Sequence, residues 1–208
     1  MKSYLRFLSR NKLYTAIEVV GLSVSLAFVI LMSAYVIGNM SYDREIKDKD
    51  EIYLCHNIGF ATSYSFLEDE FTMYPEIREF CQFGRAPIGI FVEAELPQHS
   101  NTLWVTDNFF SFLQFKLVEG DPDEVLKKDF SAVVSESFAE RYFSGEHPIG
   151  SSIEVDYNGT KRFLTVTGVF KDVKKSNILN SDVLVNQRLV PSIGNGGWYE
   201  CVNLVRFS

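Results

Sequence analysis

The sequence predicts an α+β protein in which an N-terminal transmembrane helix precedes a mixed α/β domain. Three observations predict this fold class. An uncharged apolar stretch of 19 residues runs from Val19 to Ile37. The middle of the chain alternates short apolar strands with short helices, whose starts carry capping residues. The dipeptide Asn158-Gly159, between two alternating segments, is a strong signal for a β-hairpin.

The apolar stretch fits a membrane span. As a helix it would be about 28 Å long, close to the roughly 30 Å hydrocarbon core of a bilayer. A buried core helix would usually be shorter and would carry a polar stripe, which this stretch lacks. A cleaved signal peptide is disfavoured because its apolar segment usually has only ~7–15 residues and ends in a small-residue cleavage site. We therefore expect residues 13–40 to form a transmembrane helix.

Charge is distributed unevenly along the chain. The net charge of −7 combines −10 in residues 39–208, −1 at Glu18 and +4 in residues 1–12, where Lys2, Arg6, Arg10 and Lys12 lie. Basic residues beside a span stay in the cytoplasm, so the N-terminus should lie inside and residues 41–208 outside. Residues 1–12 fit either an interfacial helix with a basic stripe or a plain basic flank. The acidic bulk argues against binding to nucleic acid.

Within the span, small residues recur at the spacing that lets two helices approach closely. Gly21 and Ser25 are four residues apart, as are Ser23 and Ala27. This spacing predicts a helix-packing face. Glu18 lies one turn inside the inner interface, where a carboxylate can reach headgroups or Lys12. Residues 14–20 also resemble the start of type IV pilins, but Leu13 stands where that family has a glycine.

After the span we expect a charged helical stalk up to Glu51 and then a series of short elements. In order these are a strand over 52–60, helices over 65–71 and 75–80, strands over 88–95 and 101–106, and a helix capped by Asp107 with Phe109, Phe110 and Leu113 on one face. Phe115 and Leu117 should lie on a strand. Gly120 should form a turn, after which Asp121 caps a helix that starts at Pro122.

The second half of the chain has clearer signals. We expect a buried strand over 132–134, and then a helix capped by Ser135, or by Ser137 in a capping box with Glu140. Phe138, Tyr142 and Phe143 should face the core, and Gly145 should end this helix. The hairpin should place Asp156 opposite Lys161 and Ile153 opposite Leu164, with its second strand reaching Phe170. Further strands are expected over 183–185 and 202–207. Because the chain stops within the last of these, we expect a fragment.

The sequence offers no motif for catalysis. Residues 145–152 have the glycine spacing of a phosphate loop but lack its lysine. His56, His99 and His147 are isolated from one another. Cys55, Cys81 and Cys201 form no Cys-x-x-Cys pair, so we expect free thiols, although one disulfide bond stays open. We therefore predict no catalytic residue, metal or cofactor, and the chain is not expected to be an enzyme.

Four segments together resemble the MacB/FtsX-like permease family of ABC transporters, in the form common in Bacteroidetes. The first is Asn11-Lys12-Leu13-Tyr14-Thr15-Ala16-Ile17 with Gly21-Leu22-Ser23, and the second is Ser41-Tyr42-Asp43 with Ile52-Tyr53. The third contains Phe109-Phe110, Phe112, Phe115, Leu117 and Glu119-Gly120-Asp121. The fourth runs from Val133-Val134-Ser135-Glu136 through Ala139, Tyr142-Phe143 and Pro148-Ile149-Gly150 to Val166-Thr167-Gly168-Val169. Their order and spacing carry the likeness.

The resemblance implies a fold and a function as expectations. The fold would be a first transmembrane helix, followed by a periplasmic core domain of βαβ-type units in two lobes. The partners would be an ABC ATP-binding subunit, a second permease subunit in a homo- or heterodimer, the inner membrane, and an exported substrate or an envelope partner. ATP hydrolysis by the partner would move the outer domain. The alternative, from another class, is a single-span envelope sensor or binding module.

The matching positions that we expect to matter structurally are Tyr42, Asp43, Phe109, Phe110, Gly120, Asp121, Phe143, Pro148, Gly150 and Gly168. The predicted domain boundaries are residues 1–12 for the cytoplasmic interfacial helix, 13–40 for the span, and 41–208 for the periplasmic core domain.

Overall fold

The computed structural model describes residues 12–43, 46–55, 73–85, 88–91, 101–143, 145, 147–157, 159–173, 176, 178–189 and 201–207. The chain divides into two compact units, residues 1–42 and residues 43–208. In the described part of the first unit there is one apolar helix, and the second unit is a mixed α/β domain built on a large sheet. This architecture confirms the predicted fold class.

The helix of the first unit, α2, spans Lys12–Asn39. It is long and apolar enough to cross a membrane, with a mean hydropathy of 2.3 over its most apolar window. It extends beyond the charge-free stretch at both ends. Ser23 and Ser25 donate their hydroxyl hydrogens to the carbonyls of Val19 and Gly21, at 2.7 and 2.9 Å. Such bonds inside the helix let hydroxyl groups sit at membrane depth without an outside partner. The predicted interfacial helix lies outside the described residues.

The second unit is built on one sheet, in which ten strands are described. Its strand order is β1-β10-β2-β4-β9-β6-β8-β7-β3, and β5 pairs with β8 beside this path. The strands are β1 (Ile52–Cys55), β2 (Ile77–Arg85), β3 (Ile88–Phe91), β4 (Thr102–Val105), β5 (Leu117–Glu119), β6 (Ser131–Ser135), β7 (Ser152–Tyr157), β8 (Thr160–Phe170), β9 (Val183–Asn186) and β10 (Cys201–Phe207).

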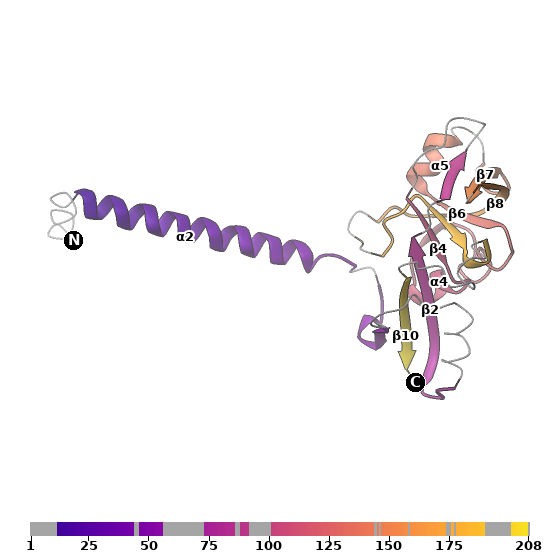
Figure 1. The fold of residues 1–208 in the computed structure, drawn as a ribbon, viewed down its shortest axis with the longest axis horizontal. Helices are drawn as coiled ribbons and strands as arrows, with labels where there is room; N and C mark the ends of the chain where they lie inside the picture. The colour runs from indigo at the N-terminus through magenta and orange to yellow at the C-terminus, as the bar shows by residue number, and fades with distance from the viewer. Residues whose placement is uncertain are drawn as a thin grey trace. The chain divides into compact units, whose positions relative to one another are not determined.

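The described part of the domain also contains two short α-helices and two 3₁₀ turns: α4 (Phe109–Leu113), α5 (Glu136–Tyr142), η1 (Lys49–Glu51) and η2 (Gln187–Leu189). Figure 1 shows α5 beside β6, β7 and β8, with β10 alongside β2. β6 and β8 are parallel, and α5 lies between them in the chain. The expected βαβ unit is therefore present, with β7 added as a hairpin partner of β8.

The central strands are buried on both faces, which separates the apolar side chains into two cores. Along β4, Trp104 points to one face while Leu103 and Val105 point to the other. The α5-side core holds Trp104, Ala132, Val134, Val183 and Val185, with Phe138 of α5. The α4-side core holds Leu103, Val105, Val133, Leu184 and the side chains of α4. The two cores share one sheet within one compact unit, and the division into two lobes stays a prediction.

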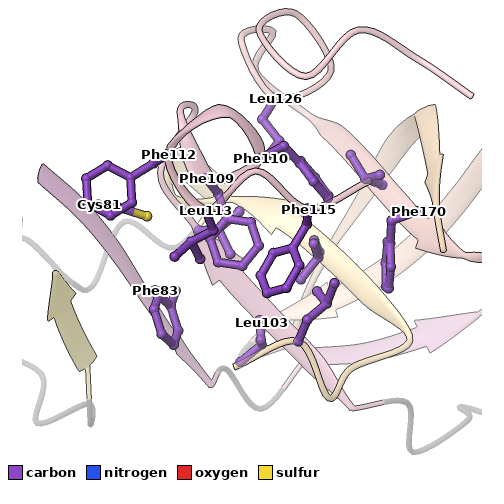
Figure 2. Close-up of a cluster of buried hydrophobic side chains, with 14 of the residues drawn as sticks. Cys81, Phe83, Leu103, Phe109, Phe110, Phe112, Leu113, Phe115, Leu126 and Phe170 are labelled. Atoms are coloured by element: carbon purple, nitrogen blue, oxygen red, sulfur yellow. The ribbon is translucent and has the colours of Figure 1, made fainter. Parts of the chain in front are cut away.

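The helix α4 buries four of its five side chains: Phe109, Phe110, Phe112 and Leu113. Figure 2 shows these four side chains in the cluster that also contains Phe83, Leu103 and Phe170 of the sheet. Phe109 has ring contacts with Phe83, Phe110 and Phe115, with centroids 5.5–5.9 Å apart. The contacts of Phe109 with Phe83 and Phe110 are edge-to-face, and such pairs add about 0.5–1.5 kcal/mol each beyond the buried area. The predicted shared face of Phe109, Phe110 and Leu113 is confirmed.

The hairpin matches its predicted register. Asp156 pairs with Lys161 and Ile153 pairs with Leu164, and β8 ends at Phe170. Gly159 has φ of +79°, the conformation that the turn requires at its second position. The carboxylate of Asp156 accepts a hydrogen bond from the Gly159 amide at 2.8 Å. Local turn chemistry therefore sets the register of β7 with β8.

The predicted helix over 75–80 is wrong. Pro75 and Glu76 lie in a turn, and Ile77–Arg85 form β2, which pairs with β10 and β4. A proline at a helix start is also a common turn residue, and the β-prone sequence that follows finds partners on both sides. The strands predicted over 52–60 and 88–95 are described only as β1 and β3. The predicted helix over 65–71 lies outside the described residues.

The charged stalk predicted up to Glu51 is also wrong where it is described. Asp43 and Asp48 have φ of +53° and +52°, which a continuous helix does not allow. Ile46 is buried in the α4-side core, and only the 3₁₀ turn η1 is helical. A single apolar side chain among many charges thus attaches this segment to the domain. Phe115, predicted on a strand, is buried just before β5.

The helix caps predicted at Asp107 and Asp121 are wrong, and of the alternatives Ser135 and Ser137 the first is confirmed. Asp107 does not cap α4, because the N-cap is Asn108 and Asp107 instead forms an ion pair with Arg188. Ser135 rather than Ser137 caps α5, accepting a hydrogen bond from the Phe138 amide at 3.1 Å. Asp121 does accept a bond from the Asp123 amide, but turns follow instead of a helix. α5 ends at Tyr142 with Phe143 as its C-cap, and Gly145 follows in a turn.

The three cysteines are free thiols, as expected. Cys81 is fully buried, and this burial raises the pKa of its thiol to about 12, although the Thr106 hydroxyl opposes the shift. Burial also raises the pKa of Cys55.

The shift at Cys81 predicts a loss of stability in alkali. Above pH 9 the unfolded thiol loses its proton while the folded one keeps it, so stability falls as pH rises from about 9 towards 12. The expected slope from this group is about 1.4 kcal/mol per pH unit. Unfolding midpoints of wild type and Cys81→Ala, measured at intervals between pH 8 and 11, should show a shallower slope for the variant. Parallel slopes would contradict the prediction.

Candidate functional site

Two of the predicted motif glycines lie against each other. Gly120 precedes the turn after β5, and Gly168 lies in β8, where β5 and β8 pair. A Cβ atom on Gly120 would lie 2.6 Å from Val125 Cγ1 and 3.3 Å from the Cα of Gly168. A Cβ atom on Gly168 would lie 2.8 Å from the same methyl group. Both positions therefore need glycine so that β5, β8 and Val125 can approach closely.

A bulge beside Gly168 completes this contact. The pairing of β6 with β8 shifts between Ala132 and Val133, so Thr167 is an extra residue in β8. Its hydroxyl lies 2.5 Å from the Val125 carbonyl and 3.1 Å from the Ala132 carbonyl. Gly120 has φ of +112°, which also favours glycine. We call Gly120, Val125, Thr167 and Gly168 the glycine contact. Sequence reasoning missed Val125 and Thr167 as its members.

The predicted turn residues Pro148 and Gly150 lie next to the same strand. The amide of Gly150 donates to the Val166 carbonyl at 2.8 Å, and the Val166 amide donates to the Ser151 carbonyl at 2.9 Å. Gly150 has φ of +90°, and Ser151 donates its amide hydrogen to Pro148. This turn therefore extends the pairing of β7 with β8. His147, at its start, lies 3.4 Å from a carboxylate oxygen of Glu119, next to Gly120.

Other motif positions serve packing or turns. Phe109 and Phe110 lie fully buried on α4, and Phe143 is half-buried against the α5-side core. Asp121 accepts the amide hydrogen bond of Asp123 at 2.9 Å. These motif positions therefore contribute to how the domain is built.

Tyr42 and Asp43 occupy the junction between the two units. The Asp43 carboxylate accepts a hydrogen bond of 2.6 Å from the Ser176 hydroxyl. Ser176 is itself buried and accepts bonds from the amides of Ile178 and Leu179. The sequence predicted Asp43 but not Ser176. The only available signal was weak, since a serine two or three residues before apolar positions is a common start of a turn.

The predicted membrane-helix positions lie on α2. Gly21 has no atom within 4 Å of the place where a Cβ would lie, so another helix could approach there. The Gly21-Ser25 packing face stays a prediction. Lys12 is the first described residue of α2, whereas Lys2, Arg6 and Arg10 lie outside the described residues.

The described residues line two hollows. One of 190 Å³ is lined by Asn101, Phe170, Asp172, Val173, Leu179, Asn180, Ser181 and Asp182. Another of 530 Å³ is lined by Phe110, Ser111, Gln114, Phe115, Lys116, Leu117, Gly120 and Pro122. Among the described residues, no group of three His, Cys, Asp or Glu side chains could hold a metal ion. The absence of an enzymatic activity stays a prediction.

A family comparison covers nearly the whole chain. The model of the MacB-like periplasmic core domain matches residues 15–200, which include most of α2 and of the second unit. The chain belongs to the MacB-like periplasmic core domain family. This membership and the apolar helix indicate an inner-membrane protein. No curated protein sequence matches the chain.

Solved structures show the same fold at low identity. The periplasmic region of MacB from Actinobacillus actinomycetemcomitans has a TM-score of 0.54 at 20% identity, over 79% of this chain and 77% of that one. A domain of a putative permease protein from Porphyromonas gingivalis has a TM-score of 0.52 at 20% identity. The match covers 64% of this MacB-like chain. This chain spans only 57% of the length of the permease domain.

The third structure is the extracellular domain of the noncanonic ABC-type transporter YknZ from Gram-positive bacteria. It has a TM-score of 0.53 at 13% identity, over 76% of this chain and 82% of that one. The MacB-like fold is thus shared between the periplasmic region of one transporter and the extracellular domain of another. At these identities the likeness concerns the fold.

Proposed function

We propose that this MacB-like chain is part of the permease subunit of an ABC-type export or mechanotransmission complex. An ATP-binding subunit in the cytoplasm hydrolyses ATP, and α2 transmits the resulting movement to the domain outside. The chain itself hydrolyses no ATP. The observation that carries the proposal is the family match over residues 15–200, because it includes both the apolar helix and the domain.

The charge pattern supports the proposed orientation. Lys2, Arg6, Arg10 and Lys12 precede the apolar residues of α2, and basic flanks stay in the cytoplasm. The net charge of −10 over residues 39–208 fits a domain on the opposite side. The permease would act as a homo- or heterodimer, with an exported substrate or an envelope partner bound outside.

The proposal is tested by isolating the complex. The full-length gene product that contains this chain is tagged at its N-terminus and purified in mild detergent from its own membranes. We expect an ABC ATP-binding subunit to co-purify, and the isolated complex to hydrolyse ATP. A permease with its tag intact but without an ATPase would contradict the proposal and favour a single-span sensor.

The packing face of α2 gives a second prediction. Gly21→Leu should reduce disulfide crosslinking between two copies of α2 several-fold, because leucine would keep the helices apart. Gly38→Leu is the matched control, since Gly38 lies on a different side of the same helix and also has free space. Equal crosslinking in Gly21→Leu and wild type would contradict a packing role for this face.

A further inference from the structure

Hydrogen-bonded turns continue from the end of α2 to Tyr42. The amides of Met40, Ser41 and Tyr42 donate to the carbonyls of Val36, Gly38 and Asn39, at 2.9–3.2 Å. The Ser41 hydroxyl lies within 3.0 Å of the carbonyls of Ile37 and Gly38. Only three residues separate α2 from Asp43, and their amides are all bonded back to the helix. The backbone of the first unit is therefore hydrogen bonded as far as Tyr42, and the next residue, Asp43, begins the second unit.

Asp43 is then held by a buried serine. Its carboxylate lies 2.6 Å from the hydroxyl of Ser176, which is 6% exposed. A hydrogen bond to a charged group is about twice as strong as one between neutral groups. The same hydroxyl oxygen accepts the amide hydrogens of Ile178 and Leu179, at 3.1 and 2.8 Å. Asp43 thus orients the hydroxyl that organises the turn over residues 176–179.

This turn leads into the centre of the sheet. Leu179 is 2% exposed and belongs to the α4-side core, as does Ile46, three residues after Asp43. Val183, four residues after Leu179, begins β9, which lies between β4 and β6. Two residues near the start of the second unit are therefore attached to the rest of the domain, Asp43 through the Ser176 hydroxyl and Ile46 through the α4-side core. The covalent route continues instead to β1, which pairs with β10 at one end of the described strand order.

We infer that the Asp43–Ser176 hydrogen bond is the clasp through which displacement of α2 enters the domain. This inference rests on the proposed function, in which α2 moves during the ATPase cycle. Through the clasp, a displacement of α2 moves the 176–179 turn and then the central strand β9. This route is shorter than the covalent route to β1. Asp43 and Ser176 are positioning residues, because they act through the turn and contact no substrate.

The first experiment measures the clasp without any partner. The full chain in phosphatidylcholine nanodiscs is analysed by hydrogen–deuterium exchange of peptides that cover residues 176–186. Asp43→Ala should speed exchange of the Ile178 and Leu179 amides by about tenfold. The effect should disappear in a Ser176→Ala background, because both variants break the same bond. Asp43→Asn keeps an acceptor and should lie between wild type and Asp43→Ala.

A matched control comes from the same segment. Asp48 accepts an exposed hydrogen bond of 3.2 Å from Gln114, so Asp48→Ala removes a carboxylate without touching the clasp. Its exchange over residues 176–186 should equal that of wild type. An equal acceleration in Asp48→Ala and Asp43→Ala would overturn the inference, because loss of charge alone would then explain the result.

The second experiment uses the purified complex with its ATPase, compared without nucleotide and after trapping with ATP and vanadate. In wild type, exchange over residues 176–186 should differ at least threefold between the two states. That difference should be lost in Asp43→Ala and reduced in Asp43→Asn. A difference that persists in Asp43→Ala overturns the inference and leaves the proposed function standing. A wild-type complex without any difference in the domain overturns the proposed function as well.

Discussion

Replacing Gly120 with alanine is expected to destabilise the domain by about 3 kcal/mol, through a steric clash and backbone strain together. The new Cβ would lie 2.6 Å from Val125 Cγ1, and φ at this position is +112°. For a domain of this size, the loss lowers the Tm by roughly 6–12 °C. The measurement is thermal unfolding of the full chain in detergent, followed by tryptophan fluorescence.

Two further variants separate the steric clash from the backbone strain in the stability loss expected for Gly120→Ala. Gly145→Ala adds a side chain at φ of +92° with open space around it, so it should cost only about 1–2 kcal/mol. Gly168→Ala adds a clash at 2.8 Å without a positive φ, and it should cost about 1–3 kcal/mol. Val125→Ala should relieve part of the Gly168→Ala loss. If the stability losses of Gly168→Ala and Val125→Ala simply add in the double variant, the close packing proposed for the glycine contact is contradicted.

Phe109→Ala is expected to cost about 3–5 kcal/mol, because it opens a cavity in the α4-side core. Phe109 is fully buried and contacts three other aromatic rings, so the cavity has rigid walls. Since α4 has only five residues and buries four of them, its packing stabilises it more than its helix propensity does. The same thermal unfolding measurement should show a Tm lower by roughly 6–20 °C.

The matched control for this variant is Phe163→Ala. Phe163 lies on β8 and is 68% exposed, so its removal should change stability by less than about 0.5 kcal/mol. If both phenylalanines cost the same, the assignment of Phe109 to the core is wrong. A folded Phe109→Ala protein with a wild-type Tm would contradict the importance of the aromatic cluster.

Signals confined to a few residues predicted the local structure well. The charge-free stretch predicted α2, and Asn158-Gly159 predicted the register of β7 with β8. In each case the physical cause lies within the segment itself, as apolar length or as turn chemistry. The buried strand over 132–134 was likewise visible as a run of apolar residues.

Errors arose where a distant partner decides the structure. Residues 75–80 carry a helix-start signal, but β10 and β4 supply strand partners from far along the chain. Asp107 looks like a helix cap, yet Arg188 draws it into an ion pair at 3.1 Å. The charged run before Glu51 hides Ile46, whose burial depends on the α4-side core.

The candidate site shows the same division. Asp43, Gly120 and Gly168 were recognised from motif spacing, but their contacts were not. Ser176, which bonds Asp43, lies 133 residues after it in the chain. Val125, which contacts Gly168, lies 43 residues before it. A single sequence contains no signal for such pairings, because any turn serine or core valine would look alike.

The central claim is that α2 crosses the membrane with the domain outside and the N-terminus inside. The most direct measurement labels single cysteines with a membrane-impermeant maleimide in spheroplasts. Lys47→Cys and Lys2→Cys are each placed in a Cys55→Ser/Cys201→Ser background, where only the fully buried Cys81 remains. We predict rapid labelling at position 47, and labelling at position 2 only after lysis. Labelling at position 2 in intact spheroplasts, with position 47 protected, would contradict the account.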